Sequence, residues 1–198
     1  MTGVRTPQQQ RSITTKNKLE SAAKILFSQK GYHGTNAREI SDEAGVSVGS
    51  FYAYYEDKKA IFMEIFRKHS EDRILEIIRN IPKDAIRAKE SVYRIIKAML
   101  DANELSPEFH REVMALRYTD PEVEALYQRI HAQSIQIFMA YLQSKKEELR
   151  IQDIEAAATV VCNAAEEVLH AVKTFCTGMN EQRLIEALSD MIHRYLYN

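Results

Sequence analysis

Residues 37–55 read AREISDEAGVSVGSFYAYY, and this stretch decides the fold of the N-terminal third of the chain. The first half has the spacing of a short amphipathic helix with Ile40 on its apolar face, and Gly45 ends that helix. Ser47 is a suitable N-cap for a second short helix that runs to about Tyr54. Two short helices joined by a glycine turn are typical of a helix-turn-helix.

The second short helix is unusually aromatic, because Phe51, Tyr52, Tyr54 and Tyr55 fall within five positions. At helical spacing these side chains point in different directions, so the core cannot hold all of them. We expect Phe51 and Tyr55 to anchor the helix inward and the other two tyrosines to face a partner. Core packing alone is the alternative interpretation of this run.

The rest of the chain predicts an all-α fold, since helical spacing recurs throughout and no strand pattern is found. Glycine and proline are sparse, at 6 and 4 residues. Ser106 and Asp120 each precede a proline, which marks the start of a helix. We expect helices over about residues 14–30, 58–80, 84–103, 107–117, 121–147, 152–177 and 181–196.

Charge is distributed unevenly along the chain, although the net charge is only −1. Residues 1–68 contain 11 Lys and Arg against 7 Asp and Glu, whereas the remainder contains 16 against 21. A basic N-terminal third indicates an anionic partner at one end only. From the helix pattern we expect two domains, 1–56 with the helix-turn-helix and 57–198 with the long helices that follow it.

Several function classes are disfavoured by composition. No apolar run approaches the roughly 20 residues of a membrane span, and no signal-peptide pattern is found, so a cytoplasmic protein without a membrane partner is expected. Cys162 and Cys176 fit a reducing compartment as buried thiols, with a redox switch or an inter-subunit disulfide as alternatives. No nucleophile–base set, phosphate loop or zinc spacing indicates an enzyme, and no cofactor is expected.

Two segments carry a resemblance to a known family. Residues 23–35 follow the pattern A-x-x-L-F-x-x-K-G-Y-x-G-T, and residues 45–58 follow GVSxGSFYxYYxxK. Together with the helix-turn-helix between them, they resemble the DNA-binding segment of TetR (tetracycline-repressor-like) regulators. The resemblance covers about a third of the chain, and beyond about residue 68 only length and helix rhythm agree.

The resemblance implies roles for particular residues. Thr35 would cap the second helix and offer its hydroxyl to a phosphate. Apart from the resemblance, we expect Arg38 or an arm that carries Arg5 and Arg11 to assist base readout, with a surface ion pair as the alternative for Arg38. Lys58 would contact a phosphate, and Tyr52 and Tyr54 would contact the DNA backbone. Base contacts are expected at the front of the recognition helix, from Ser47, Val48, Gly49 and Ser50.

A regulator that reads two half-sites must dimerise, and the last two helices carry suitable apolar and small residues. The expected interface comprises Ala157, Val161, Ala164, Val168, Val172, Leu184, Leu188, Met191 and Tyr195. An ordinary core within one chain is the alternative for these helices. The middle helices are expected to bind an unidentified small-molecule effector through Phe66, Ser70, Tyr93, Ile96, Met99, Met114, Arg117, Tyr118, Phe138, Tyr141, Glu166 and His170.

The sequence thus predicts a homodimeric transcriptional regulator, expected to be a repressor that an effector releases from a near-palindromic double-stranded DNA operator. A transcriptional activator of the same fold is one alternative, and a helical ligand carrier without DNA binding is another. Glu167 and His170 also form a Glu-x-x-His pair, a fragment of the di-iron bundle pattern. No second copy of this pair lies in a matching position, so no metal site is expected.

Overall fold

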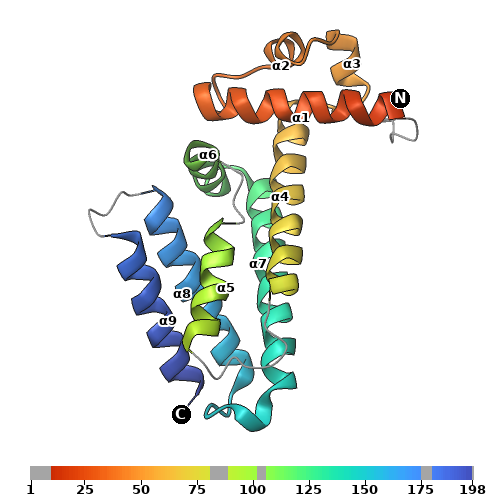
Figure 1. Ribbon diagram of the computed structural model, residues 1–198. Helices are drawn as coiled ribbons and strands as arrows, with labels where there is room; N and C mark the ends of the chain where they lie inside the picture. Colours follow the sequence, from red (N-terminus) through yellow and green to blue (C-terminus); the bar gives the residue numbers. More distant parts are fainter. Residues whose placement is uncertain (1–9, 81–88, 102–105, 175–179, 198) are drawn as a thin grey trace. The chain divides into compact units, whose positions relative to one another are not determined.

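The fold is that of a computed structural model, which describes residues 10–80, 89–101, 106–174 and 180–197. Within these ranges the structure contains helices and no strand, which confirms the predicted all-α class. The helices are shown in Figure 1. They are α1 (Gln10–Lys30), α2 (Ala37–Glu43), α3 (Val48–Tyr52), α4 (Lys58–Asn80), α5 (Lys89–Asp101), α6 (Pro107–Arg117), α7 (Pro121–Ser144), the 3₁₀ turn η1 (Lys146–Glu148), α8 (Ile154–Thr174) and α9 (Glu181–Leu196).

The predicted helix starts are confirmed where proline follows a capping residue. The hydroxyl of Ser106 accepts a hydrogen bond from the backbone N–H of Phe109, and the carboxylate of Asp120 accepts from Glu122 and Val123. These side chains satisfy N–H groups that the first turn of a helix leaves unpaired. The structure differs at other ends: α1 begins at Gln10, α7 ends at Ser144, and the predicted ends of the 84–103 and 152–177 helices lie outside the described residues.

The chain divides into two compact units. Unit 1 comprises Met1–His69 and Leu105–Leu126, and unit 2 comprises Ser70–Glu104 and Tyr127–Asn198. Helix α6 therefore belongs to the same unit as the helix-turn-helix, which the sequence did not indicate. The functional division into residues 1–56 and 57–198 stays a prediction.

The core of unit 1 is built on three aromatic rings. Phe27 of α1, Phe62 of α4 and Phe109 of α6 are fully buried, and the rings of Phe62 and Phe109 are stacked with centroids 4.8 Å apart. Phe27 meets Phe62 edge-on at 5.3 Å. Such aromatic pairs contribute beyond the area that they bury, so they fix α1, α4 and α6 to one another.

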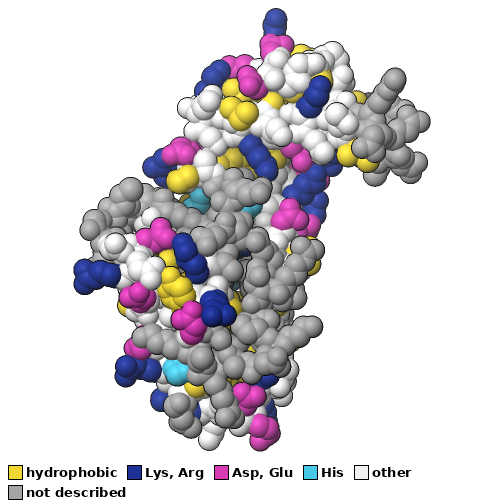
Figure 2. Space-filling model, viewed as in Figure 1, with side chains coloured by type: hydrophobic (Ala, Val, Ile, Leu, Met, Phe, Trp, Pro, Cys, Tyr) yellow, Lys and Arg dark blue, Asp and Glu magenta, His cyan; other side chains and the backbone are white. Residues whose placement is uncertain are grey.

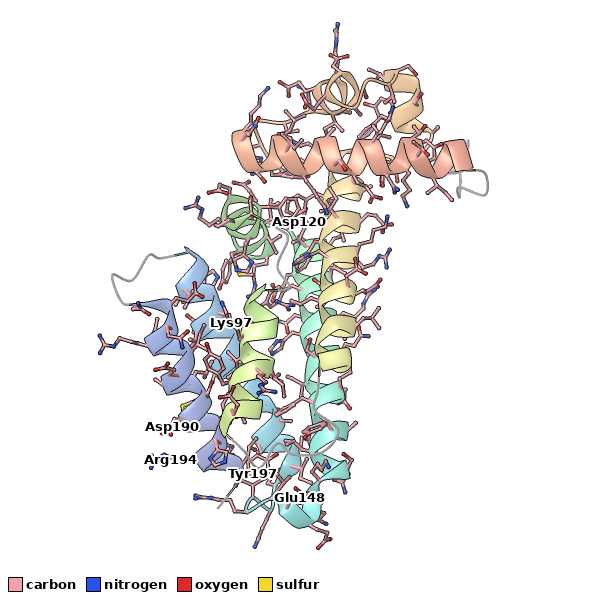
Figure 3. The ribbon with its side chains drawn as sticks, in the orientation of Figure 1. Lys97, Asp120, Glu148, Asp190, Arg194 and Tyr197 are labelled. Carbon is pink, nitrogen blue, oxygen red and sulfur yellow. The ribbon has the colours of Figure 1, made fainter. Side chains whose placement is uncertain are left out.

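The core of unit 2 lies where α5, α8 and α9 pack together, as Figure 1 shows. Small residues of α8, such as Ala157 and Ala158, are fully buried and allow α9 to approach closely. At the surface, Lys97 of α5 lies 3.3 Å from Glu181, and Arg194 pairs with Asp190 on α9 at 2.7 Å. Figure 3 labels three of these four side chains.

Candidate functional site

The turn between α2 and α3 has the geometry of a helix-turn-helix. Gly45 has φ of +64°, a left-handed conformation that residues with a side chain rarely adopt. Its N–H donates to the carbonyl of Asp42, and the N–H of Val46 donates to that of Ser41. A Cβ atom at Gly45 would meet nothing within 4 Å, so backbone conformation alone requires glycine there. The predicted turn glycine is confirmed.

The N-cap of α2 is Asn36, and the expectation that Thr35 caps this helix is wrong. The side chain of Asn36 accepts hydrogen bonds from the backbone N–H groups of Arg38 and Glu39. In turn, the carboxylate of Glu39 accepts a hydrogen bond from the backbone N–H of Asn36. This is a reciprocal capping box. Thr35 is buried instead, and its hydroxyl donates to the carbonyl of Gly31 at 2.8 Å. In this conformation the Thr35 hydroxyl is not available to a phosphate.

The recognition helix α3 begins as the sequence predicts. Ser47 is its N-cap, and the Ser47 hydroxyl accepts from the N–H of Ser50 at 3.1 Å. The two serine hydroxyls also lie 2.8 Å apart. Ser47 and Gly49 are exposed, while Val48 and Ser50 are half-buried. The front of α3 is therefore a small, uncharged surface, and its predicted base contacts stay a prediction.

The aromatic run divides between core and surface. Phe51 and Tyr55 are buried, which confirms their expected inward orientation, whereas Tyr52 is 55% exposed. Tyr54 is half-buried, and its hydroxyl lies 2.8 Å from that of Ser12 on α1. Tyr52 is thus accessible to a partner, while the Tyr54 hydroxyl already has one within the chain.

A buried carboxylate holds the end of the aromatic run to α1 and α4. The Tyr55 hydroxyl donates to Glu20 at 2.6 Å, and Lys68 donates to both Glu20 oxygens at 2.7 and 2.9 Å. Burial, with the Glu20 hydrogen bond and negative charge, raises the pKa of Tyr55. The contact orients the segment after α3 relative to both long helices.

Lys58 makes its hydrogen bonds within the chain. Its ammonium group donates to the carbonyls of Tyr32 and Thr35, at 2.8 and 2.9 Å. It also lies 4.5 Å from the centroid of the Tyr32 ring, a cation–π distance. These contacts tie the start of α4 to the loop between α1 and α2, and the predicted phosphate contact of Lys58 stays a prediction.

The cation with the clearest access in this region is Arg38. Its side chain is 84% exposed, and its guanidinium lies 4.0 Å from Asp42, a weak surface pair. Arg5 and the side chain of Arg11 lie outside the described residues. In the view of Figure 2, basic side chains lie beside acidic ones across the described surface.

Helix α6 is fastened to the loop that precedes α2. The carboxylate of Glu112 accepts from the N–H of Tyr32 at 2.7 Å, and the hydroxyls of Ser106 and Ser28 lie 2.8 Å apart. Further along unit 1, Lys59 pairs with Asp120 and Glu122 at 3.3 and 2.8 Å. These bonds hold α6 and the start of α7 to α1, to the loop after α1 and to the start of α4.

Four of the predicted effector-binding residues lie in unit 1, and three of them are in contact. Phe66 is buried, and Arg117 pairs with Glu124 at 3.0 Å and lies near the sulfur of Met114. Tyr118 caps the end of α6 and is 80% exposed. The Arg117 guanidinium also lies 5.2 Å from the centroid of the Tyr118 ring, so Arg117 contacts both Met114 and Tyr118.

The remaining predicted effector-binding residues lie in unit 2. Tyr93 donates to Gln182 of α9 at 2.9 Å, and the rings of Phe138 and Tyr141 are stacked. The Tyr141 hydroxyl lies close to Tyr197, whose position beside Glu148 Figure 3 shows. Ser70 and Ile96 are buried, Glu166 and His170 are half-buried, and the side chain of Met99 lies outside the described residues.

Glu166 is the centre of a polar cluster between α7 and α8. One of its oxygens accepts from the Tyr127 hydroxyl in a very short hydrogen bond, and the other lies 2.7 Å from Nδ1 of His131. Burial, followed by the charge of Glu166, raises the pKa of Cys162 to about 11. A thiol with this pKa stays protonated and unreactive near neutral pH.

Sequence reasoning missed Arg73, Tyr127 and His131. The Nε atom of Arg73 is buried and has no hydrogen-bond partner among the described residues. Burial lowers the Arg73 pKa, against the opposing influence of Glu166 and Tyr127. Tyr127 and His131 are four residues apart, as are Cys162 and Glu166, so each pair shares a helix face. That spacing is a sequence signal for each pair, but it does not show that the two faces meet.

Three of the residues expected at a dimer interface are buried within the single chain. Ala157, Val161 and Leu188 belong to the core of unit 2. Val160 and Met191 are exposed apolar side chains, at 53% and 49%. The sequence predicts Met191 at the interface but not Val160. The other expected interface residues are Ala164, Val168, Val172, Leu184 and Tyr195, all half-buried, and Met191 itself.

Among the described residues, no helix is long and apolar enough to cross a membrane.

Comparison with known families gives two matches. Residues 19–65 match the family of bacterial regulatory proteins, tetR family. Residues 89–196 match the family described as Tetracyclin repressor-like, C-terminal domain. The first match covers the helix-turn-helix, and the second covers more than half of the chain.

Individual relatives are more distant. The uncharacterized HTH-type transcriptional regulator YuxN of Bacillus subtilis is 30% identical over 125 residues, which is 60% of this chain and 40% of YuxN. The chain thus spans less than half the length of that relative. The fatty acid degradation regulator FadR of Bacillus halodurans superposes with a TM-score of 0.72 at 15% identity, over 94% of this chain and 96% of FadR. A transcriptional regulator of Saccharomonospora viridis in complex with choline has a TM-score of 0.75 at 19% identity, over 92% and 97% of the two chains. Both superpositions show a shared fold.

Proposed function

This chain belongs to the TetR family of bacterial regulatory proteins, and from that premise we propose that it is a sequence-specific DNA-binding regulator. It acts as a repressor at a near-palindromic operator and is released by a small-molecule effector. The outward face of α3, with Ser47, Gly49 and Tyr52 exposed, is the observation that carries this proposal. A helix with a small, uncharged front can approach base edges in a major groove closely.

Each part of this surface has a proposed task. The exposed front of α3 reads the bases, through contacts with thymine methyl groups and through DNA shape. The Tyr52 hydroxyl donates to a phosphate, and Arg38 adds a charge contact. Phe51 and Tyr55, both buried, hold α3 in place while it does so. Lys58 acts mainly by fixing the loop before α2, through its two carbonyl contacts.

The experiment is a selection of the purified protein against a random duplex library, with sequencing of the retained DNA. The informative variant is Gly49→Leu. A Cβ atom at Gly49 meets only the Ser47 hydroxyl, at an ordinary 3.7 Å, so the variant folds, yet its side chain fills the space that DNA must occupy. Ala132→Leu is the matched control, because it places the same leucine side chain at an exposed position of α7.

An enriched inverted repeat with the wild type and with Ala132→Leu is the expected result, while Gly49→Leu yields none at an unchanged unfolding temperature. Affinity falls steeply with salt, as phosphate contacts require. If the wild type enriches no sequence and binds no DNA at low salt, the proposed function is wrong, and a helical ligand carrier is the better interpretation.

Binding to an inverted repeat requires two copies of the chain, with recognition helices about 34–36 Å apart or a multiple of that spacing. We propose a homodimer through the outer faces of α8 and α9, supported by the exposed Val160 and Met191. Val160→Glu combined with Met191→Glu should yield monomers in sedimentation equilibrium. Ala132→Glu is the control for added charge, and a dimer that survives the double change excludes this interface.

Regulation requires an effector that binds the DNA-incompetent conformer more tightly than the DNA-bound one. The choline complex of a protein with this fold supports a search for a small molecule. Equal effector affinity with and without operator would contradict release. Transcription from a reporter promoter separates the two modes of regulation, because an activator raises expression and a repressor lowers it.

A further inference from the structure

The polar cluster of unit 2 contains more charge than the packing of its helices needs. It consists of Arg73 on α4, Tyr127 and His131 on α7, and Cys162 and Glu166 on α8. Polar groups in a helical core cost free energy unless they are paired with one another. In this cluster the acidic side chain has hydrogen-bond partners, whereas one N–H group of the basic side chain has none. This difference is the starting point for assigning a role to the cluster.

The negative partner of the cluster is already satisfied. Glu166 receives the Tyr127 hydroxyl on one oxygen and Nδ1 of His131 on the other, the latter at 2.7 Å. Two donors from successive turns of α7 therefore orient the carboxylate. Since both oxygens have a partner, Glu166 needs no further cation for its hydrogen bonding.

The positive member, Arg73, has one buried N–H donor that is not satisfied. The Nε–H of Arg73 is buried and donates to nothing in the described part of the chain, and no ion pair of Arg73 is found there. Glu166 and Tyr127 are near enough to influence its charge, yet neither is hydrogen-bonded to it. The Arg73 side chain is half-buried, and a buried N–H donor without a partner lowers stability, so a role outside the fold is indicated.

We propose that the cluster is the effector site of the regulator, and that Arg73 pairs there with a single carboxylate of the effector. This inference rests on the proposed function and names the class of its ligand. The planar fork of arginine presents parallel N–H donors that match the two oxygens of a carboxylate. A single carboxylate keeps the repulsion from Glu166 small, and a second negative charge would increase it.

The test uses matched small molecules that differ only in the head group. One set is octanoate, octanol and octylammonium, and the other is benzoate, benzyl alcohol and benzylamine. Thermal unfolding of the full chain is followed by circular dichroism as each compound is titrated. The variants are Arg73→Met and Arg73→Lys, with Arg129→Met as the control for loss of an exposed arginine on α7.

In at least one set, the carboxylate is expected to raise the unfolding temperature of the wild type and of Arg129→Met more than its alcohol and amine do. Arg73→Met loses this difference, with the apparent Kd weakened at least about tenfold, as expected for a lost charged hydrogen bond. Arg73→Lys keeps the charge without the fork and falls between the two. Without any compound, Arg73→Met unfolds at the same temperature as the wild type or higher.

Other results overturn the proposal. A larger shift with the amines, abolished by Glu166→Gln, would make this a cation site. Equal shifts within both sets, no shift in either set, or a carboxylate effect that survives in Arg73→Met would exclude the named class. A lower unfolding temperature for both Arg73 variants but not for Arg129→Met would give Arg73 a structural role. Operator binding without ligand, measured separately, shows whether the proposed function itself has failed.

Discussion

Replacing Tyr55 by phenylalanine removes one hydroxyl from the buried contact that holds the segment after α3. That hydroxyl donates to Glu20 at 2.6 Å, and Glu20 keeps two short bonds from Lys68 when it is gone. A hydrogen bond to a charged group contributes about 1.5–3 kcal/mol. Because Lys68 still pairs with the carboxylate, we expect Tyr55→Phe to cost about 1.5–2 kcal/mol, at the lower end of that range.

The contribution of this contact is isolated by a double-mutant cycle with Glu20→Gln. Two groups in direct contact couple by about 0.5–3 kcal/mol, and we expect about 1 kcal/mol or more here. Urea unfolding is followed by circular dichroism, with hydrogen exchange of α1 and α4 peptides to locate the change in unit 1. Tyr118→Phe is the control, since Tyr118 is 80% exposed and should change the free energy of unfolding by less than about 0.5 kcal/mol.

The same contact predicts a response to pH. The pKa of Tyr55 is raised in the folded protein, so above about pH 10 an unfolded tyrosine releases a proton that the folded one retains. The free energy of unfolding therefore falls as pH rises beyond 10, by up to about 1.4 kcal/mol per pH unit. Tyr55→Phe lacks this slope. Parallel pH curves for wild type and variant, or an additive cycle with Glu20→Gln, would refute the reasoning.

Three further changes test the local structure. Asn36→Ala removes the N-cap of α2 and should lower the free energy of unfolding by about 1 kcal/mol in urea titrations, whereas Thr35→Ser, which keeps the bond to Gly31, should change it little. The Cβ atom of Gly45→Ala would meet no other atom within 4 Å, but alanine is strained at φ of +64°. We therefore expect the free energy of unfolding to fall by about 1 kcal/mol, with a lower thermal midpoint. Burial opposes the ionisation of Glu64, but Arg67 and Lys16 outweigh it and lower its pKa, so its contribution is lost as pH falls below about 4.5. Glu64→Gln should therefore flatten the acid limb of a pH–stability curve.

The helix-turn-helix could be predicted from sequence because its signals are local. The turn needs a glycine at one position, and Ser47 caps the next helix from three residues away, so both are visible within a short window. Thr35 shows the limit of this reasoning. Thr35 and Asn36 are adjacent and both suit an N-cap. The choice between them is decided by the burial of Thr35 and its hydrogen bond to the Gly31 carbonyl.

The polar cluster of unit 2 could not be predicted as a whole because its contacts are not local. Glu166 and Tyr127 are 39 positions apart, and Arg73 comes from a third helix. Helical spacing identifies which residues share a face, but it does not show which faces meet. The same limit explains the dimer prediction, since Ala157 and Val160 are equally apolar and only the packing of α9 separates the buried one from the exposed one.

The residues of the aromatic motif divide their work in a way that the motif alone does not reveal. Tyr54 and Lys58 carry polar groups suited to phosphate, yet both spend hydrogen bonds on α1 and its following loop. Tyr52, between them and the turn, keeps most of its surface exposed. A surface that must meet DNA in one orientation gains affinity when its support is fixed before binding. In the proposed function, the bond of Tyr54 to α1 and those of Lys58 to the loop before α2 position the helix-turn-helix, and Tyr52 makes the contact with DNA.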